Sequence, residues 1–378
     1  MVVDPLRSWT VLAYIVADDD RKPLLNPFAS GELSAMKQAA IDEDIDLAAY
    51  VDFTGPEIAS QRCFVEGRKG EDPGACRNTV EDNSATMSSL KEFLEFASKR
   101  MKPNSHIAMF LWGHGAGPAG FFLDPNPEPQ KSLALPEMFE AFQSLRSPIE
   151  VMLFRDCWTA NLELAYQFDG LVNYVIASQG LVPIPGAWPF RKLFQTLKQT
   201  DPAQPQQIAQ LLGPLDEHYQ LARNRGVPPL DEVRFTALNL VHSRATLTPA
   251  LSRFVSALEG LTGTDRSASR AVMEHAKGGD VALVDVMTMC EELATFPSPV
   301  GTAAVDLHAA ATQLFIDQTN GTPDIPGNSL RGVSLFRRPA ARVTDSNFIE
   351  SVVYDCYKVL PLCDATRWHE IAYETLFE

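Results

Sequence analysis

The segment HIAMFLWGHG (106–115) decides the fold class that we expect, because it joins an unbroken apolar run to a histidine flanked by glycines. Apolar residues that follow one another without alternation are typical of a strand buried on both faces of a parallel sheet. Gly113 and Gly115 then allow the backbone to turn sharply on either side of His114. We therefore expect a buried strand that presents His114 at its carboxyl end.

A second segment of the same kind follows, EVMLFRDC (150–157), which ends in Cys157 before a helix expected over 159–168. One further helix, expected at 135–145, separates the two segments and suits a single crossover connection. The carboxyl ends of neighbouring parallel strands lie at the same edge of a sheet, where ligands commonly bind. The sequence therefore predicts that His114 and Cys157 lie side by side.

Other apolar strands and helical patterns alternate around this pair. We expect strands at 9–17, 45–53, 60–66, 172–179 and 234–240, and helices at 31–43, 88–101, 205–223, 244–259, 266–277, 283–295, 300–318, 346–359 and 367–377. This alternation predicts an α/β fold with a largely parallel central sheet flanked by helices on both faces. We divide the chain into a sheet domain at 1–240 and a mostly helical C-terminal subdomain at 241–378, which contributes a late strand near 332–337.

The composition excludes several classes of protein. Apolar residues make up 45% and charged residues 21%, as in ordinary globular proteins, and the net charge of −16 argues against a nucleic-acid partner. No apolar stretch reaches the roughly 20 residues that span a bilayer, and the opening residues 1–20 lack the pattern of a secretory signal. We therefore expect no membrane partner and a cytoplasmic location. Disulfides are not expected in that compartment, and the six cysteines form no CxxC or zinc-like spacing.

Cys157 and His114 suit nucleophilic catalysis, because a cysteine attacks as the thiolate and a neighbouring histidine can take its proton. A helix beginning at Cys157 would add unpaired N–H groups and a dipole that favour negative charge. However, a cysteine that ends a buried strand is more often an inert core residue, and a histidine after a strand is more often an ordinary loop residue. The pattern alone leaves the catalytic and the structural interpretations equally open.

Five blocks of the sequence, in the same order, resemble the clostripain family. WTVLAYIVADDD (9–20), LWGHGAG (111–117), FRDCWTANLELAYQF (154–168), VIASQGLVPIPGAWPF (175–190) and GVSLFRRP (332–339) are similar to that family's WTVLVYMAADND, LWDHGSGW, FDACLMGSLEVAYEL, VASEExEPGxGWxY and GLSIYFP segments. The family shares its structural clan with caspases, legumain, gingipain and separase. The resemblance implies a caspase-like fold, with 1–240 as the peptidase domain, and the activity of a cysteine endopeptidase that acts on proteins or peptides.

The resemblance also implies the roles of individual residues. His114 would be the general base, Cys157 the nucleophile, and the backbone N–H groups of Gly115 and Cys157 the oxyanion hole. Trp188 would shape the substrate groove, although a core aromatic residue is an equally good interpretation. Further substrate-binding candidates are Asp18, Ser178 and Gln179.

The two residues that directly precede the nucleophile differ from the family pattern. Members that cleave after Arg or Lys usually carry Asp two residues before the cysteine and a small residue directly before it, whereas this chain has Arg155 and Asp156. An arginine in the P1 pocket would repel a basic side chain and favour Asp or Glu. Arg155 would lose this effect if Asp156 neutralised it or if its side chain pointed away. We keep Arg or Lys as the expected P1 residue.

The family further implies a latent single chain that is cut between its histidine and cysteine blocks. In this chain that connection includes PNPEPQKSLALP (125–136), and we expect cleavage near Lys131, by the enzyme itself or by an upstream activating protease. An uncut surface loop is at least as good an interpretation. No cofactor is expected to be required. Calcium, on which some members depend, is a candidate ligand of the acidic residues at 18–20, although a solvated acidic loop is the preferred interpretation.

Two alternatives remain open at this stage. The chain could be a pseudo-peptidase or interaction module that keeps the fold without turnover, for which Arg155 and Asp156 give some support. It could also be a cysteine hydrolase or transferase that acts on a non-peptide substrate.

Overall fold

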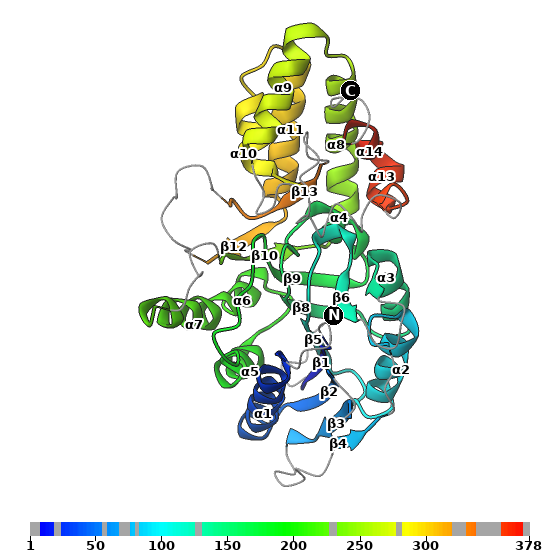
Figure 1. Cartoon of the computed structure of the whole chain (residues 1–378), viewed down its shortest axis with the longest axis vertical. Helices are drawn as coiled ribbons and strands as arrows, with labels where there is room; N and C mark the ends of the chain where they lie inside the picture. Colours follow the sequence, from blue (N-terminus) through cyan, green and yellow to red (C-terminus); the bar gives the residue numbers. More distant parts are fainter. Residues whose placement is uncertain are drawn as a thin grey trace.

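A largely parallel sheet forms the centre of the molecule, with helices against both faces and a helical region beyond one edge (Figure 1). The computed structural model describes residues 8–18, 24–54, 59–67, 76–79, 83–124, 131–226, 233–276, 282–319, 330–337 and 357–372. Within these residues the sheet has nine strands in the order β12-β10-β9-β8-β5-β1-β2-β3-β4. This arrangement confirms the expected α/β class.

The strands at the middle of the sheet are parallel. They are β2 (Asp46–Phe53), β1 (Trp9–Ala17), β5 (His106–Trp112), β8 (Ile149–Arg155) and β9 (Val172–Ser178). Antiparallel strands continue the sheet at both edges, namely β3 (Gln61–Val65) and β4 (Cys76–Asn78) beyond β2, and β10 (Phe235–Asn239) and β12 (Phe315–Gln318) beyond β9. The middle strands are buried almost without alternation, which is why their sequences are continuous apolar runs.

Two hydrophobic clusters pack on the two faces of the sheet. One face carries α1 (Asn26–Glu43), α5 (Phe190–Gln199), α6 (Pro205–Ala209) and α7 (Leu212–Asn224), and the other carries α2 (Met87–Ser98), α3 (Leu135–Phe142) and α4 (Leu162–Gln167). Successive residues of a strand supply opposite clusters, as Tyr14 and Ile15 do in β1. A bilayer-spanning helix is absent from the described part of the chain.

The C-terminal region forms the helical part at the top of Figure 1. It contains α8 (Ser243–Glu259), α9 (Gly263–His275), α10 (Val286–Leu293), α11 (Val300–Thr312), α13 (Pro361–Thr366), α14 (Trp368–Glu370) and the paired strands β11 (Leu283–Asp285) and β13 (Ser334–Phe336). The late strand expected near 332–337 is β13, which pairs with β11 rather than with the central sheet. Side chains of this region belong to the same cluster that covers one face of the sheet, so the boundary at residue 240 does not separate two cores.

Some elements of the structure differ from the expected ones. The helix expected at 300–318 ends at Thr312, because Phe315 and Ile316 instead extend the open edge of β10 as β12, a role that suits aromatic and β-branched residues. The helix expected at 205–223 is divided into α6 and α7. Helix α5 was not expected from the sequence. The helix expected at 346–359 lies mainly outside the described residues.

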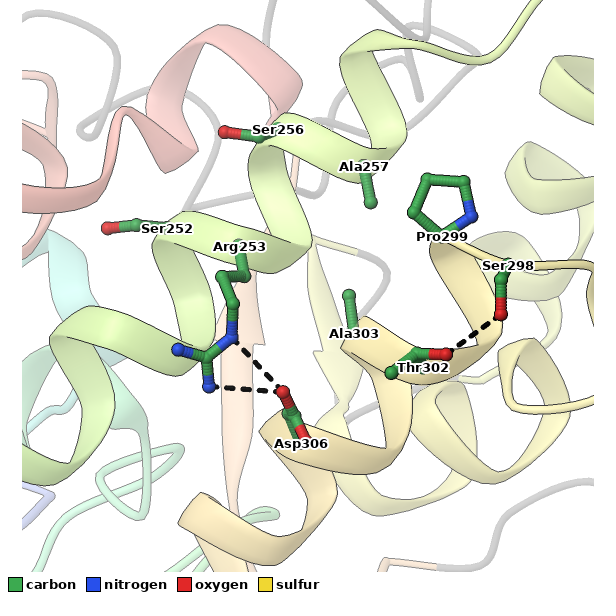
Figure 2. Close-up of a pocket in the computed structure, with 9 residues that line it drawn as sticks. All are labelled: Ser252, Arg253, Ser256, Ala257, Ser298, Pro299, Thr302, Ala303 and Asp306. Carbon is green, nitrogen blue, oxygen red and sulfur yellow. Dashed lines mark hydrogen bonds and ion pairs between the residues drawn. The ribbon is translucent and has the colours of Figure 1, made fainter.

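A pocket of about 640 Å³ lies between α8 and α11 (Figure 2). Small side chains such as Ala257, Pro299 and Ala303 line it, and Arg253 pairs with Asp306 at one end, where both nitrogen–oxygen distances are 3.1 Å. None of its lining residues is among the expected catalytic or substrate-binding residues, so this pocket is not part of the expected site.

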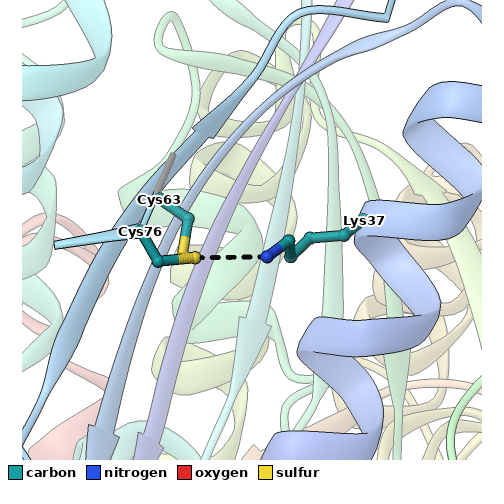
Figure 3. Close-up of a disulfide and its surroundings, with 3 residues drawn as sticks. All are labelled: Lys37, Cys63 and Cys76. Carbon is teal, nitrogen blue, oxygen red and sulfur yellow. Dashed lines mark hydrogen bonds between the residues drawn. A yellow bond between two sulfur atoms is a disulfide. The ribbon is translucent and has the colours of Figure 1, made fainter. Parts of the chain in front are cut away.

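A disulfide joins Cys63 of β3 to Cys76 of β4, so the expectation that the chain lacks disulfides is wrong (Figure 3). The two residues are direct partners in the antiparallel register, which brings their Cα atoms to 3.9 Å. The expected cytoplasmic location does not predict this pairing, because the pairing depends on the register of two edge strands. The cytoplasmic location stays a prediction, and the disulfide, which is typical of oxidising compartments, weighs against it.

A buried carboxylate connects α4, the helix after β8, to the C-terminal region. Glu163 of α4 accepts hydrogen bonds through one oxygen from the Phe336 N–H (2.8 Å) and from the Tyr357 O–H (2.5 Å). Its other oxygen is buried and has no hydrogen-bond partner among the described residues. Burial raises the pKa of Glu163 from its ordinary 4.5 to about 7, although the Tyr357 and Phe336 hydrogen bonds act in the opposite direction.

This pKa predicts a pH dependence of stability. The folded protein binds the proton of Glu163 more tightly than the unfolded chain does, so this contribution is complete below about pH 4.5 and is lost as the pH rises to about 7. We expect a loss on the order of 3 kcal/mol in the free energy of unfolding. Glu163→Gln keeps the acceptor oxygen and should flatten the difference between pH 4.5 and pH 7, measured by urea denaturation. Equal pH slopes in both proteins would contradict the assignment.

Candidate active site

The two expected catalytic segments meet at the carboxyl edge of the sheet. Strands β5 and β8 are parallel neighbours, and their register pairs Trp112 with Arg155, the last residue of each. One residue further on, the Gly113 N–H donates a hydrogen bond of 2.6 Å to the Asp156 side chain. His114 and Cys157 are the next residues after these two, Gly113 and Asp156, along the sequence. The structure therefore brings together the two segments that sequence analysis placed side by side.

Glycines flank His114 because the backbone there is closely packed. A Cβ atom on Gly115 would lie 2.3 Å from the Cys157 carbonyl oxygen and 2.9 Å from the Cys157 nitrogen, and one on Gly113 would lie 2.7 Å from the Phe122 ring. The Phe122 N–H donates to the His114 carbonyl at 2.8 Å and holds the turn from outside. The His114 side chain itself is exposed. His114 is therefore exposed at the surface on a tightly packed backbone, and the residue that follows it, Gly115, packs against the Cys157 backbone.

Cys157 does not lie at a helix N-terminus, which corrects the expectation for 159–168. Helix α4 begins only at Leu162, with the Asn161 side chain accepting the Leu164 N–H at 2.8 Å. The residues between Cys157 and α4 instead lie beside the end of β9, where the Ala160 N–H donates to the Ser178 carbonyl at 2.9 Å. The helix dipole therefore does not stabilise a thiolate at this position.

Residues 180–186, which we call the covering loop, contact Cys157 and residues before and after it. The Trp158 N–H donates to the Gly180 carbonyl at 3.0 Å, and the Val182 N–H donates to Cys157 Sγ at 3.3 Å. The Cys157 side chain is partly buried. The pKa of the Cys157 thiol is raised to about 11, mainly by burial; the Val182 N–H opposes this rise, and the Asp156 charge adds to it. In this conformation the raised pKa favours the neutral thiol of Cys157.

Arg155 is fully buried, and its charge is neutralised by Glu32 of α1 rather than by Asp156. Its Nη2 donates to the Gly186 carbonyl at 2.6 Å, and the guanidinium carbon lies 5.6 Å from the ring centroids of both Trp112 and Trp188. Glu32 is not among the residues expected at the site from the sequence. The available signal was an acidic residue on the otherwise apolar face of α1, where its buried neighbours are Leu33, Met36, Ala39 and Ala40.

The other substrate-binding candidates are buried. The Gln179 side chain donates to Asp285 at 2.7 Å and accepts the Gly332 N–H at 2.8 Å, so it connects β9 to the C-terminal region. Ser178 accepts the Gly180 N–H at 3.2 Å. Trp188 is a core residue whose indole N–H donates to the Tyr219 hydroxyl at 3.1 Å, and its ring centroid lies 5.6 Å from the Arg155 guanidinium carbon. Ser178 contacts the covering loop directly, and Trp188 is linked to it through Tyr219, whose hydroxyl donates to the Pro183 carbonyl at 3.2 Å.

The acidic cluster expected at 18–20 is formed differently in the structure. Asp18 lies with Asp52 and Asp124, and one carboxylate oxygen of each lies within 4.8 Å of the others, while residues 19 and 20 lie outside the described residues. All three are buried, and the Ser84 hydroxyl lies 2.6 Å from Asp52 and 2.9 Å from Asp124. Converging carboxylate oxygens are the ligands that calcium prefers, so these residues fit a divalent cation.

The expected processing segment is only partly described. Residues 125–130 lie outside the described residues, and Lys131 begins β7 (Lys131–Leu133), which pairs with β6 (Phe121–Asp124). Lys131 therefore lies at the base of a hairpin, opposite Asp124.

Known proteins resemble this chain in sequence family and in fold. Residues 13–220 match the model of the clostripain family. The fold is similar to a secreted C11 cysteine protease from Bacteroides thetaiotaomicron in complex with an irreversible peptide inhibitor, at a TM-score of 0.65 and 17% identity, over 96% of this chain and 99% of the other. It is also similar to an inactive zymogen C11 protease from Parabacteroides distasonis, at 0.66 and 16% over the same shares. No curated protein matches this chain in sequence. At these identities the structural likeness concerns the fold.

Proposed function

Because the chain belongs to the clostripain family of cysteine peptidases, we propose that it hydrolyses internal peptide bonds with Cys157 as nucleophile and His114 as general base. The observation that carries this proposal is the meeting of the two strand ends, where Gly115 packs directly against the Cys157 backbone. A structural cysteine and an unrelated loop histidine would not need such a close approach between the segments that carry them.

The geometry suits the steps of peptide hydrolysis. His114 takes the thiol proton, and Cys157 attacks the carbonyl carbon of the substrate. The backbone N–H groups of Gly115 and Cys157 stabilise the negative charge that develops on the carbonyl oxygen. His114 then returns the proton to the leaving amine, and water hydrolyses the acyl-enzyme.

The chain is proposed to be made in a latent form. The neutral Cys157 thiol, which accepts the Val182 N–H, supports this, because attack requires movement of the covering loop or a change in its surroundings. Cleavage near Lys131, by this enzyme or by an upstream protease, is the proposed trigger. One protein of similar fold is described as an inactive zymogen. The raised thiol pKa would equally suit a pseudo-peptidase, which differs from a zymogen in that no treatment restores Cys157-dependent cleavage.

A basic P1 residue is the proposed preference. Arg155 stands at the position that usually carries Asp, but its pairing with Glu32 removes the unbalanced positive charge that would repel Arg or Lys. Asp18, Asp52 and Asp124 at the same edge of the sheet make the field there negative unless a cation is bound.

A peptide library that varies only at P1 tests the proposal. We expect Cys157-dependent cleavage that is at least about 10-fold faster after Arg or Lys than after Asp or Glu, which corresponds to about 1.4 kcal/mol. The assay is run with calcium and with a chelator, and lower activity in the chelator would support the calcium site. Faster cleavage after Asp would show that Arg155 remains available to the substrate and would overturn the P1 preference.

A further inference from the structure

The side chain of Asp156 lies between the two glycines that flank His114. One carboxylate oxygen accepts the Gly113 N–H at 2.6 Å. On the other side, a Cβ atom on Gly115 would lie 3.0 Å from the Asp156 Cβ. Asp156 therefore binds the histidine segment through Gly113, before His114, and lies closely packed against Gly115, after it.

Asp156 is an unusual group for this place. It is fully buried, and its second carboxylate oxygen has no hydrogen-bond partner among the described residues. A buried carboxyl group with an unused oxygen costs stability that a small side chain would avoid. An ordinary packing role therefore does not explain why the position before Cys157 carries aspartate.

We propose that Asp156 is a positioning residue, whose carboxyl group holds the His114 loop against Cys157 and whose charge controls the reactivity of the thiol. This inference rests on the proposed function, since it assigns the two residues a common reaction. The hydrogen bond to Gly113 begins where the β5–β8 ladder ends, so it continues the pairing of the two strands by one residue beyond their last backbone partners.

The charge of Asp156 acts mainly on Cys157. Burial raises the pKa of Asp156 to about 8, and the Gly113 N–H opposes this, so the group changes charge near neutral pH. In its ionised form it raises the pKa of the Cys157 thiol. The other titratable groups around the thiol are His114, which follows β5, Tyr219 of α7, which interacts with both Cys157 and Arg155, and Arg155 itself, which is paired with Glu32. The covering loop, GLVPIPG (180–186), contains no titratable side chain.

Two variants of Asp156 separate its two effects. Asp156→Asn keeps an oxygen acceptor for Gly113 and removes the charge, whereas Asp156→Ala removes both. We expect Asp156→Ala to lower kcat by about 10- to 100-fold with little change in KM, because the His114 loop loses its anchor. Asp156→Asn should stay within about 3-fold of wild type in kcat at pH 6.5, because the anchor remains.

Alkylation of Cys157 by iodoacetamide, followed by the mass of the fragment that contains it, tests the charge without any substrate. We expect the pH midpoint of alkylation to lie about one unit lower in Asp156→Asn than in wild type. Asp46→Asn is the matched control, because Asp46 is also buried but begins β2 at the opposite edge of the sheet. This control should leave the midpoint unchanged.

The outcomes decide each part of the proposal. Equal kcat in Asp156→Ala and Asp156→Asn would overturn the positioning role. An unchanged alkylation midpoint in Asp156→Asn would overturn the control of thiol reactivity, and this result can be read even if Asp156→Ala does not fold. A wild-type protein that cleaves no peptide either before or after cutting near Lys131, but whose alkylation midpoint still responds to Asp156→Asn, would refute the proposed function and leave the influence of Asp156 on the thiol intact.

Discussion

Replacing Cys157 with alanine is expected to lower kcat/KM for peptide hydrolysis on the order of 10⁴-fold or more, since removal of a nucleophile eliminates the covalent pathway. The substitution removes one partly buried sulfur atom that accepts a single backbone N–H, so it should leave the fold unchanged. The measurement is the initial rate of cleavage of the best peptide from the P1 library, with the thermal midpoint of unfolding recorded in parallel.

Cys290→Ala is the matched control, because Cys290 is a free cysteine buried in the helical region and is not near the strand ends. It should lose little activity. The Cys157→Ala protein also reports on activation. Self-processing predicts one intact mass for the variant and two fragments, separated by a cut near residue 131, for wild type. Substantial cleavage of peptides by Cys157→Ala would place the nucleophile elsewhere.

Replacing Glu32 with alanine is expected to lower the free energy of unfolding by about 3–5 kcal/mol, because it leaves the Arg155 guanidinium buried without a counter-charge. The substitution should also disturb the covering loop. Glu32 accepts the Trp188 backbone N–H at 3.3 Å, and Arg155 holds the loop through the Gly186 carbonyl. Urea denaturation measures the stability, and a change in P1 preference toward Asp or Glu would show that Arg155 has become available to the substrate.

Asp306→Ala provides a control for the loss of an ion pair at the surface. The Arg253–Asp306 pair is substantially exposed, with 57% and 42% of the two side chains accessible, so its loss should cost less than about 1 kcal/mol. The double variant Arg155→Met with Glu32→Leu removes both buried charges and should recover most of the stability lost in Glu32→Ala. If Glu32→Ala were no more destabilising than Asp306→Ala, Glu32 would not be the partner of a charged Arg155.

The sequence predicted the strands of the central sheet closely. The segment expected at 9–17 has the bounds of β1, and the segments expected at 45–53 and 172–179 differ from β2 and β9 by one residue at one end. These strands were predictable because each is buried on both faces, so its own side chains carry the signal in an unbroken apolar run. The edge strands β4 and β12 escaped prediction, because short, partly exposed strands depend on the partner that they pair with.

The candidate site likewise contains features that the sequence predicted and features that it did not. The glycines around His114 and the position of Cys157 after a buried strand are local features, and they sufficed to place the two segments together. Glu32 beside Arg155, Asp285 beside Gln179 and Cys76 opposite Cys63 could not be predicted, since each pair depends on elements that are brought together only by folding.

The sequence by itself determined the order of the strands along the chain, the class of the sheet and the two segments that form the site, because apolar runs and glycines act over a few residues. Only the tertiary structure decided the electrostatic state of the site. The charges on Arg155, Asp156 and Cys157 depend on burial and on partners from distant elements, and a buried charge is stable only where the fold supplies its counterpart.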